Sequence, residues 1–357
     1  MAQVDLFSPI SLGDLQLRNR IVMAPLTRCR ASAGNVPNAL NAEYYRQRSS
    51  AGLIISEATQ VVPEGQGYPT TPGIHSEAQV DGWKKITEVV HAAGSKIVLQ
   101  LWHVGRVSHP VFQPDGKLPV APSPIAPKGQ IYDNTWTKVD YIAPRALELS
   151  EIPGVIDGYV KGAEKAKLAG FDGVEVHGAN GYLLDQFLRD STNKRGDAYG
   201  GSVQNRARLM LEVTEAVVGV WGASRVGIRL SPLNPNNDIA DSDPKSTFGF
   251  VARELAKLKL AYVHVLEDVK TPAGEEVTST IKAACGAPVV ANFGYTLETA
   301  QAAIGEGRVD AVAFGKLFIA NPDLPKRLAA GGPFNAWDMK AFYGGTEKGY
   351  TDYPALA

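Results

Sequence analysis

Three polar side chains with complementary chemistry lie in one short stretch, at His177, Asn180 and Tyr182. They follow Val174 and Val176, whose β-branched side chains favour a buried strand that ends at His177. His177 and Asn180 can donate hydrogen bonds to a carbonyl or nitro oxygen. Tyr182, whose phenol has an ordinary pKa of about 10, can protonate a carbanion-like centre. We therefore expect a ligand site here, with a plain strand-to-helix turn as the alternative.

The strand that ends at His177 belongs to a regular alternation of strands and helices. Apolar runs predict strands at 20–24, 52–58, 96–102, 172–177, 225–230, 261–266, 288–292 and 310–314. Helices are expected at 39–50, 76–93, 151–169, 203–221, 244–259, 275–285 and 297–306. About eight such units predict an α/β fold with a parallel sheet, closed as a (β/α)8 TIM barrel. A doubly wound open sheet is the alternative.

Two segments stand outside the alternation. Residues 1–19 read as an N-terminal hairpin that plugs one end of the barrel. Residues 104–145, after the third strand, contain many Pro and Gly residues and no helical period. Tyr132, Trp136 and Tyr141 indicate that this long insertion is a folded cap. We expect one domain, 1–357, with the insertion at about 104–145.

Bulk properties narrow the classes of function. The formal net charge is -1, and no long charge run favours nucleic acid or a membrane surface. Cys29 and Cys285 form no CxxC pair and are expected to be small buried residues in a reducing compartment. The first residues lack the features of a signal peptide, which favours a cytoplasmic protein.

The sequence offers little for metal or nucleophilic chemistry. None of the six histidines pairs as HxxxH or HExxH, and there is no GxSxG. His91 and His264 are interpreted as surface or packing residues. We therefore expect no metal.

Glycines follow the last two predicted strands, at Gly294 and Gly315, with Lys316 directly after the second. Barrel enzymes often bind phosphate at this position through backbone N–H groups, and a lysine adds a positive charge. The sequence therefore predicts a ligand that carries phosphate, and the alternative is that both glycines merely turn the chain. Other strand ends would bring Thr27, Ala58, Gln100, Trp102 and Arg229 to the same mouth.

These residues stand in motifs that resemble the Old Yellow Enzyme family of flavin-dependent ene-reductases over almost the whole chain. The matching motifs are 24–28 (APLTR), 67–68 (GY), 100–106 (QLWHVGR), 177–187 (HGANGYLLDQF), 193–195 (NKR), 199–202 (YGGS), 205–206 (NR), 229–232 (RLSP) and 321–324 (NPDL). The resemblance is greatest to the bacterial branch that reduces nitrate esters and N-ethylmaleimide.

The resemblance implies FMN bound without a covalent link. The residues it places around the isoalloxazine ring are Pro25, Thr27, Ala58, Gln100 and Arg229. Thr27 would bond O4 of the ring, Gln100 its pyrimidine edge, and Arg229 would place positive charge near N1. Gly294 and Gly315 match the phosphate-binding site of the family. Lys316 stands where the family usually has arginine, so its side chain could not form the two parallel hydrogen bonds that a guanidinium makes with phosphate.

The resemblance also implies the substrate site. His177 and Asn180 match the pair that binds the activating group, and Tyr182 matches the proton donor. Tyr68, Trp102 and Tyr350 are expected as aromatic walls. The implied activity is ping-pong reduction of enones, maleimides and nitroalkenes, and of nitrate esters, by NADPH or NADH through flavin N5. The alternatives are a barrel isomerase or aldolase, and a non-catalytic flavin-binding protein. A monomer or homodimer is expected.

Overall fold

The computed structural model describes residues 4–267 and 271–356. Within these residues, eight parallel strands close into a barrel in the order β11-β12-β13-β14-β15-β3-β4-β6, because β6 also pairs with β11. Their bounds are β3 (Ile21–Met23), β4 (Leu53–Ile55), β6 (Ile97–Trp102), β11 (Gly173–His177), β12 (Val226–Leu230), β13 (Tyr262–Leu266), β14 (Val289–Asn292) and β15 (Ala311–Phe314). The predicted (β/α)8 barrel is confirmed, and the open doubly wound sheet is wrong.

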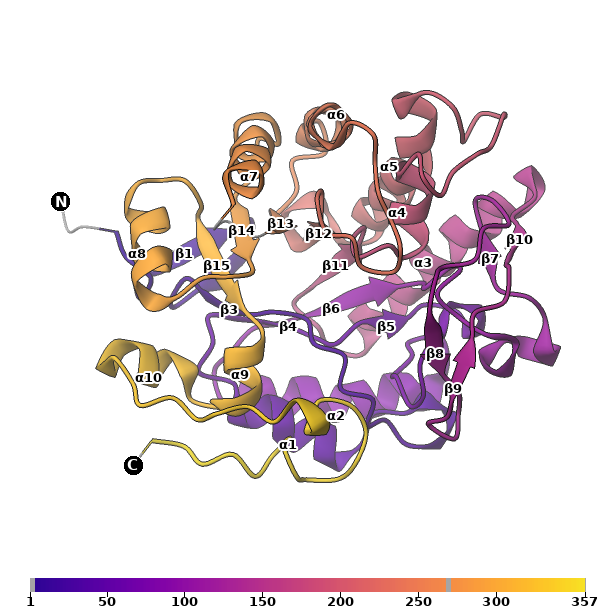
Figure 1. Ribbon diagram of the computed structural model, residues 1–357. Helices are drawn as coiled ribbons and strands as arrows, with labels where there is room; N and C mark the ends of the chain where they lie inside the picture. Colours follow the sequence, from indigo (N-terminus) through magenta and orange to yellow (C-terminus); the bar gives the residue numbers. More distant parts are fainter. Residues whose placement is uncertain (1–3, 268–270, 357) are drawn as a thin grey trace.

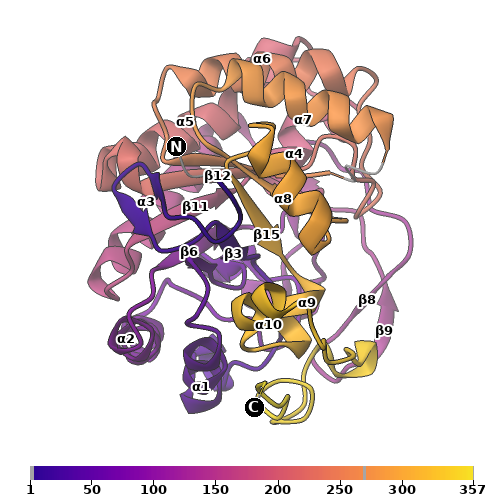
Figure 2. The ribbon, with the colours of Figure 1, turned by 90° about the vertical axis from the view of Figure 1, so that its left-hand side faces the viewer.

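Helices cover the outside of the barrel, with α5, α6 and α7 on one side of the strands and α1 and α2 on the opposite side (Figures 1 and 2). Their bounds are α1 (Ala39–Gln47), α2 (Glu77–Ala92), α3 (Ile152–Leu168), α4 (Leu183–Leu188), α5 (Val203–Trp221), α6 (Pro244–Ala256), α7 (Pro272–Ala284), α8 (Leu297–Gly305), α9 (Lys316–Ala320) and α10 (Leu324–Ala330). Among the described residues, no helix is long and apolar enough to cross a membrane.

Helix α2 shows how the sequence produces these elements. Ser76 caps its first turn by accepting a hydrogen bond from the backbone N–H of Gln79 at 3.3 Å. Trp83, Ile86 and Val90, spaced for one helical face, are fully buried in the core between the helices and the barrel. The predicted helix at 76–93 is confirmed to within one residue at each end.

The strands bury both faces, as parallel strands in a barrel must. Val174 and Val176 of β11 point outward into the core beneath the helices. Glu175 and His177 alternate with them and therefore point to the opposite face, into the barrel. Both are buried. One face of each strand thus builds the helix-covered core, and the other builds the interior that leads to the site.

The N-terminal hairpin fills the amino-terminal end of the barrel. Its strands, β1 (Ile10–Leu12) and β2 (Leu15–Leu17), are antiparallel. Leu12, Leu15 and Leu17 share one apolar cluster with interior residues of several barrel strands. The N–H of Asp14 donates to the carbonyl of Ser224, just before β12 begins, at 2.9 Å. The predicted plug is therefore confirmed.

The segment after β6 is folded, as predicted, and contains strands that the sequence did not predict. A short parallel pair joins β7 (Val120–Ala121) to β10 (Arg145–Ala146), and β8 (Gln130–Tyr132) forms a hairpin with β9 (Lys138–Asp140). Near its carboxyl end, β6 also pairs with β5 (Thr59–Gln60). These strands are too short to show a hydrophobic period in the sequence.

Candidate active site

The site lies at the carboxyl ends of β6 and β11. An apolar cluster lies beside the side chain of His177. It consists of Ala58, Trp102, Val104 and Val107, with Tyr68, Tyr141 and Tyr182 packed against it. Tyr141 comes from the segment between β6 and α3, so this insertion contributes to the site. The structure therefore gathers the aromatic rings of three separate segments around the end of β11.

The turn after His177 is fixed by hydrogen bonds from its own backbone. The N–H of Asn180 donates to Oγ of Ser231 at 2.7 Å, and the N–H of Gly181 donates to the Asp185 carboxylate at 2.9 Å. Gly181 has a φ of 74°, and a Cβ there would lie 2.6 Å from the carbonyl oxygen of Asn236. Only glycine fits this position. The turn orients the side chains of Asn180 and Tyr182 rigidly.

His177 is held as a neutral hydrogen-bond donor. Its Nδ1 accepts a bond from the N–H of Ala179 at 3.3 Å, so in the neutral ring Nε2 carries the hydrogen. Burial lowers the pKa of His177 well below its usual value, and the nearby charge of Arg229 lowers it further. The ring therefore presents Nε2–H without a positive charge near neutral pH.

Asn180, three residues after His177 in the same turn, has an unsatisfied side-chain amide. It adopts a left-handed backbone with a φ of 58°, which asparagine tolerates better than most residues. Its backbone carbonyl accepts a hydrogen bond from the Asn237 amide at 2.7 Å, but its buried side-chain Oδ1 has no partner among the described residues. A polar side chain left unpaired in this way is free to meet a ligand.

Tyr182 stands between the aromatic rings with its hydroxyl protonated. Its ring is perpendicular to those of Trp102 and His177, with both centroid distances at 5.0 Å. Its hydroxyl oxygen lies 3.1 Å from that of Tyr68. Burial raises the pKa of Tyr182 to about 12. At neutral pH the phenol is therefore an acid that still holds its proton.

Trp102 and Tyr68 form an aromatic wall, with stacked rings whose centroids are 5.8 Å apart. The expectation that Tyr350 joins them is wrong. Tyr350 lies in the core outside the barrel, stacked on Tyr44 of α1 at 4.1 Å, and its hydroxyl accepts a bond from Asn41. It stabilises the C-terminal segment against α1 rather than the site.

Tyr343 is the aromatic of the C-terminal segment that faces the site. Its side chain is 58% exposed. Burial is the main cause that raises the pKa of Tyr68 and Tyr182, and the nearby Tyr343 phenol adds to it at both. Sequence reasoning missed it, because Tyr343 and Tyr350 each lie next to glycine in an irregular segment with no periodicity. Only the path of the chain distinguishes them.

Inside the barrel, just below these rings, lies a polar layer that we define as Gln100, Glu175, Arg229, His264 and Asn292. All five side chains are buried. Arg229 donates to Oδ1 of Asn292 at 2.9 Å, and burial lowers its pKa to about 10, so it remains charged at neutral pH. His264 was expected to be a packing or surface residue; it belongs instead to this layer and bonds to Glu175 at 2.9 Å.

Unpartnered atoms in the polar layer point to a bound polar ring system. Oε1 of Gln100, Nε of Arg229 and Nε2 of His264 are buried and lack partners among the described residues. Such atoms are costly unless a ligand or water meets them. A flavin ring carries both donors and acceptors on its pyrimidine edge, so an acceptor at Gln100 and a cation at Arg229 fit it.

Three further predicted flavin contacts lie where neighbouring strands end. Pro25 and Thr27 follow β3, and Ala58 follows β4, which pairs with β3. The N–H of Arg28 donates to the Glu57 carboxylate at 3.1 Å, which ties these two loops together. Ala58 is buried and Thr27 is half-buried. Ala58 thus belongs to the apolar cluster of the site, and Thr27 lies at the end of the neighbouring strand.

The predicted phosphate end is formed by the adjacent strands β14 and β15. Gly294 has a φ of 80°, and a Cβ at Gly315 would have Leu26 at 3.4 Å as its near neighbour, so the backbone of Gly315 is open to close approach. Lys316 begins α9, is exposed, and makes no ion pair or side-chain hydrogen bond within the described residues. These residues fit a phosphate group.

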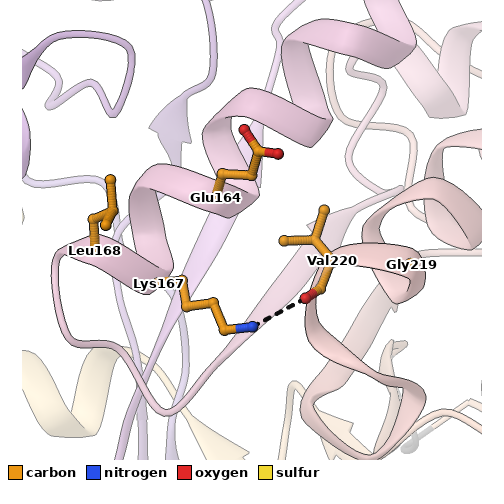
Figure 3. Close-up of a pocket in the computed structure, with 5 residues that line it drawn as sticks. All are labelled: Glu164, Lys167, Leu168, Gly219 and Val220. Carbon is orange, nitrogen blue, oxygen red and sulfur yellow. Dashed lines mark hydrogen bonds between the residues drawn. The ribbon is translucent and has the colours of Figure 1, made fainter.

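Neither a metal-binding cluster nor a second catalytic site is found among the described residues. In the residues described, no group of three or more His, Cys, Asp or Glu side chains could hold a metal ion. A surface hollow lies between α3 and α5 (Figure 3), where Lys167 donates to the carbonyl of Val220 at 3.2 Å and Glu164 is nearby. All the residues that line this hollow come from α3 and α5, on the outside of the barrel, so they are separate from the site described above.

The fold and the site define a class: a TIM barrel built to hold a flavin at the carboxyl ends of its strands. Residues 5–335 match the NADH:flavin oxidoreductase / NADH oxidase family, and the chain belongs to that family. It is an FMN-dependent oxidoreductase of the Old Yellow Enzyme type, with a nicotinamide dinucleotide as its reductant. The predicted family, enzyme class and cofactor are therefore confirmed.

Several relatives match nearly the whole chain. The flavin oxidoreductase hxnT of Emericella nidulans is 43% identical and covers 98% of this chain and 97% of its own. 12-Oxophytodienoate reductase 1 of Oryza sativa subsp. japonica is 44% identical, with 99% and 94% covered. The structure of morphinone reductase has a TM-score of 0.95 at 47% identity, covering 99% and 97%. An Old Yellow Enzyme homologue from Zymomonas mobilis gives 0.95 at 46%, covering 99% and 100%.

Proposed function

We propose that this enzyme reduces the C=C bond of electron-poor alkenes such as enones, maleimides and nitroalkenes, and that nitrate esters are further substrates. The observation that carries the proposal is the convergence of three groups at the end of β11. The neutral His177 ring, the unpaired amide of Asn180 and the protonated Tyr182 hydroxyl lie beside one aromatic wall. Two donors and one acid are what reduction of an activated alkene requires.

His177 and Asn180 bind the activating oxygen of the substrate. Negative charge builds on that oxygen when hydride reaches the β-carbon, so donors aimed at it stabilise the transition state more than the ground state. A neutral imidazole suits this role, because its Nε2–H donates without losing its proton. The same pair would hold one oxygen of a nitro group, which supports nitroalkenes and nitrate esters as substrates.

Tyr182 supplies the proton to the α-carbon. Its pKa of about 12 keeps the hydroxyl protonated until the carbon becomes basic. Trp102 and Tyr68 hold the plane of the alkene and exclude water from the reacting face. Bound FMN would supply the hydride transfer from NADPH or NADH to the substrate.

The remaining predicted residues hold the cofactor in this proposal. Gln100 and Arg229 would meet the pyrimidine edge of the ring, and Thr27 would bond its O4. Pro25 and Ala58 would pack against the ring system. Gly294, Gly315 and Lys316 would bind the phosphate, which the open backbone at Gly315 supports.

The relatives support a small carbonyl compound as substrate, since the names 12-oxophytodienoate reductase and morphinone reductase each specify a ketone. A barrel isomerase or aldolase would not need the unpaired Gln100 acceptor beneath the aromatic wall. Placement within the nitrate ester branch stays a prediction, as do the choice between NADH and NADPH and the monomeric or dimeric state.

Anaerobic turnover with a substrate panel tests the proposal. The NADPH-reduced enzyme is mixed separately with 2-cyclohexenone, N-ethylmaleimide, a nitroalkene and a nitrate ester. We expect each alkene to give its saturated product, with one mole of product formed per mole of NADPH consumed. If NADPH reduces the enzyme but no alkene reoxidises it, the proposed function is wrong.

A further inference from the structure

Glu175 is a buried acid in the interior of the barrel to which neither the sequence nor the proposed function gives a role. It lies on β11 opposite Gln100 of β6 in the register of the sheet, two residues before His177. Its side chain is fully buried, as are those of Gln100 and His264. A charged group at such a depth persists only when other groups compensate it.

Glu175 determines which way the Gln100 amide faces. Nε2 of Gln100 donates to Oε1 of Glu175 at 2.8 Å, and Nδ1 of His264 lies 2.9 Å from Oε2. An ionised carboxylate only accepts hydrogen bonds, so Gln100 must turn its NH2 group toward it. Oε1 of Gln100 is consequently left as the free, buried acceptor.

Glu175 also acts electrostatically on Arg229. Burial lowers the pKa of Arg229, and the charge of Glu175 is the largest influence that opposes the lowering. The two residues lie on the adjacent strands β11 and β12, where Glu175 is opposite Gly227, two residues before Arg229. Both side chains are buried in the low-dielectric interior, where charges act over longer distances than in water. The field at the polar layer therefore depends on both Arg229 and Glu175.

We propose that Glu175 is a positioning residue for the flavin, which presents the Gln100 carbonyl to the ring and partly neutralises Arg229 beneath it. The carbonyl of Gln100 is then ready to accept a hydrogen bond from the ring N–H of oxidised or reduced FMN. The Glu175 charge opposes the negative charge that the flavin gains on reduction. This acid therefore lowers the reduction potential of the cofactor and leaves reduced FMN a stronger hydride donor.

Glu175→Gln removes the charge of the side chain and keeps its size and shape. The variant keeps an oxygen that accepts from Gln100, and His264 can change tautomer to suit the new amide. We expect the preference for reduced over oxidised FMN to rise about tenfold, which is a midpoint potential about 30 mV more positive for a two-electron couple. The matched control is Glu164→Gln on the exposed face of α3, which should leave the potential unchanged.

Glu175→Asp tests the orientation of Gln100 independently. It retains the charge but is one methylene too short to reach the amide in place. We expect oxidised FMN to bind about fivefold more weakly, with the potential closer to that of the wild type than to that of Glu175→Gln.

The potential is measured by anaerobic dye equilibration of the FMN-loaded protein, and affinity by titration of the apoprotein with FMN. Neither measurement uses an alkene, so both are independent of the proposed substrates. The proposal is overturned if Glu175→Gln has the potential of the Glu164→Gln control. It is also overturned if Glu175→Asp binds FMN as tightly as the wild type.

Discussion

The hydroxyl oxygens of Tyr182 and Tyr68 lie 3.1 Å apart in a single hydrogen bond. Burial raises the pKa of both phenols, and the bond between them lowers the pKa of Tyr182 while it raises that of Tyr68. Either hydroxyl can be the donor. The bond therefore makes Tyr182 a stronger acid than burial alone would allow.

Tyr68→Phe should therefore slow alkene reduction without abolishing it. The ring that stacks on Trp102 stays, but Tyr182 loses the hydrogen bond that lowers its pKa and becomes a weaker acid. We expect the rate of flavin reoxidation by 2-cyclohexenone to fall roughly tenfold or less, below the usual full contribution of an acid catalyst. Stopped-flow measurement checks this, and a rate equal to that of the wild type would show that the bond between the two phenols has no catalytic role.

Removal of both donors with His177→Ala plus Asn180→Ala should impair the binding and activation of 2-cyclohexenone while FMN stays bound. Loss of donors that stabilise a developing oxyanion costs about 10²–10³-fold in rate for a single group. The matched control is His91→Ala, which removes an exposed histidine that bonds to Asp172 on the outside of the barrel. Near-normal enone turnover in the double variant would remove both residues from the substrate site.

Lys316→Ala should weaken the binding of FMN. A hydrogen bond to a charged group contributes about 1.5–3 kcal/mol, which is roughly tenfold or more in the dissociation constant. Lys161→Ala is the control, because that lysine pairs with Asp157 on the outer face of α3. Equal FMN dissociation constants for Lys316→Ala and the wild type would show that Lys316 does not contact the phosphate.

The buried ion pair behind the substrate turn should be important for stability. Nε of Arg189 donates to Asp185 at 2.7 Å, and the other guanidinium nitrogens donate to the carbonyls of Ser231 and Pro232. Arg189→Met leaves the buried Asp185 without its cation, and we expect a loss of about 3–5 kcal/mol in the free energy of unfolding.

Urea denaturation of the holoenzyme measures this loss. The exposed pair Lys161–Asp157 is again the comparison, since a surface ion pair contributes less than about 1 kcal/mol. A loss for Arg189→Met no larger than that for Lys161→Met would contradict the structural role of the buried pair.

Much of the barrel could be predicted from the sequence, because strands buried on both faces appear as apolar runs and helices such as α2 carry caps and one apolar face. Helix α4 could not, since all six of its residues are buried and it has no polar face to give a period. The insertion was recognisable as folded from its aromatic residues, but its strand pairing depends on contacts that are distant in the sequence.

The polar turn after His177 was predictable as a candidate substrate site, because its polar residues directly follow a strand and stand in a family motif. Glu175 was not, because a single acid between two valines gives no sign of whether it faces the interior or a helix. Tyr350 was assigned to the pocket by resemblance, yet the chain turns so that Tyr343 faces the site and Tyr350 packs on Tyr44. Contacts of this kind depend on the tertiary fold.

Tyr182→Phe tests the central claim most directly, because it removes one hydroxyl and keeps the ring between Trp102 and His177. The two half-reactions are followed by stopped flow. Reduction of the flavin by NADPH needs no proton from Tyr182 and should proceed nearly unchanged, whereas reoxidation by 2-cyclohexenone should slow by about 10²–10⁴-fold. A nitrate ester should be affected less, since nitrite leaves without protonation at carbon. An unchanged rate of reoxidation by 2-cyclohexenone would contradict the account and make solvent the proton source.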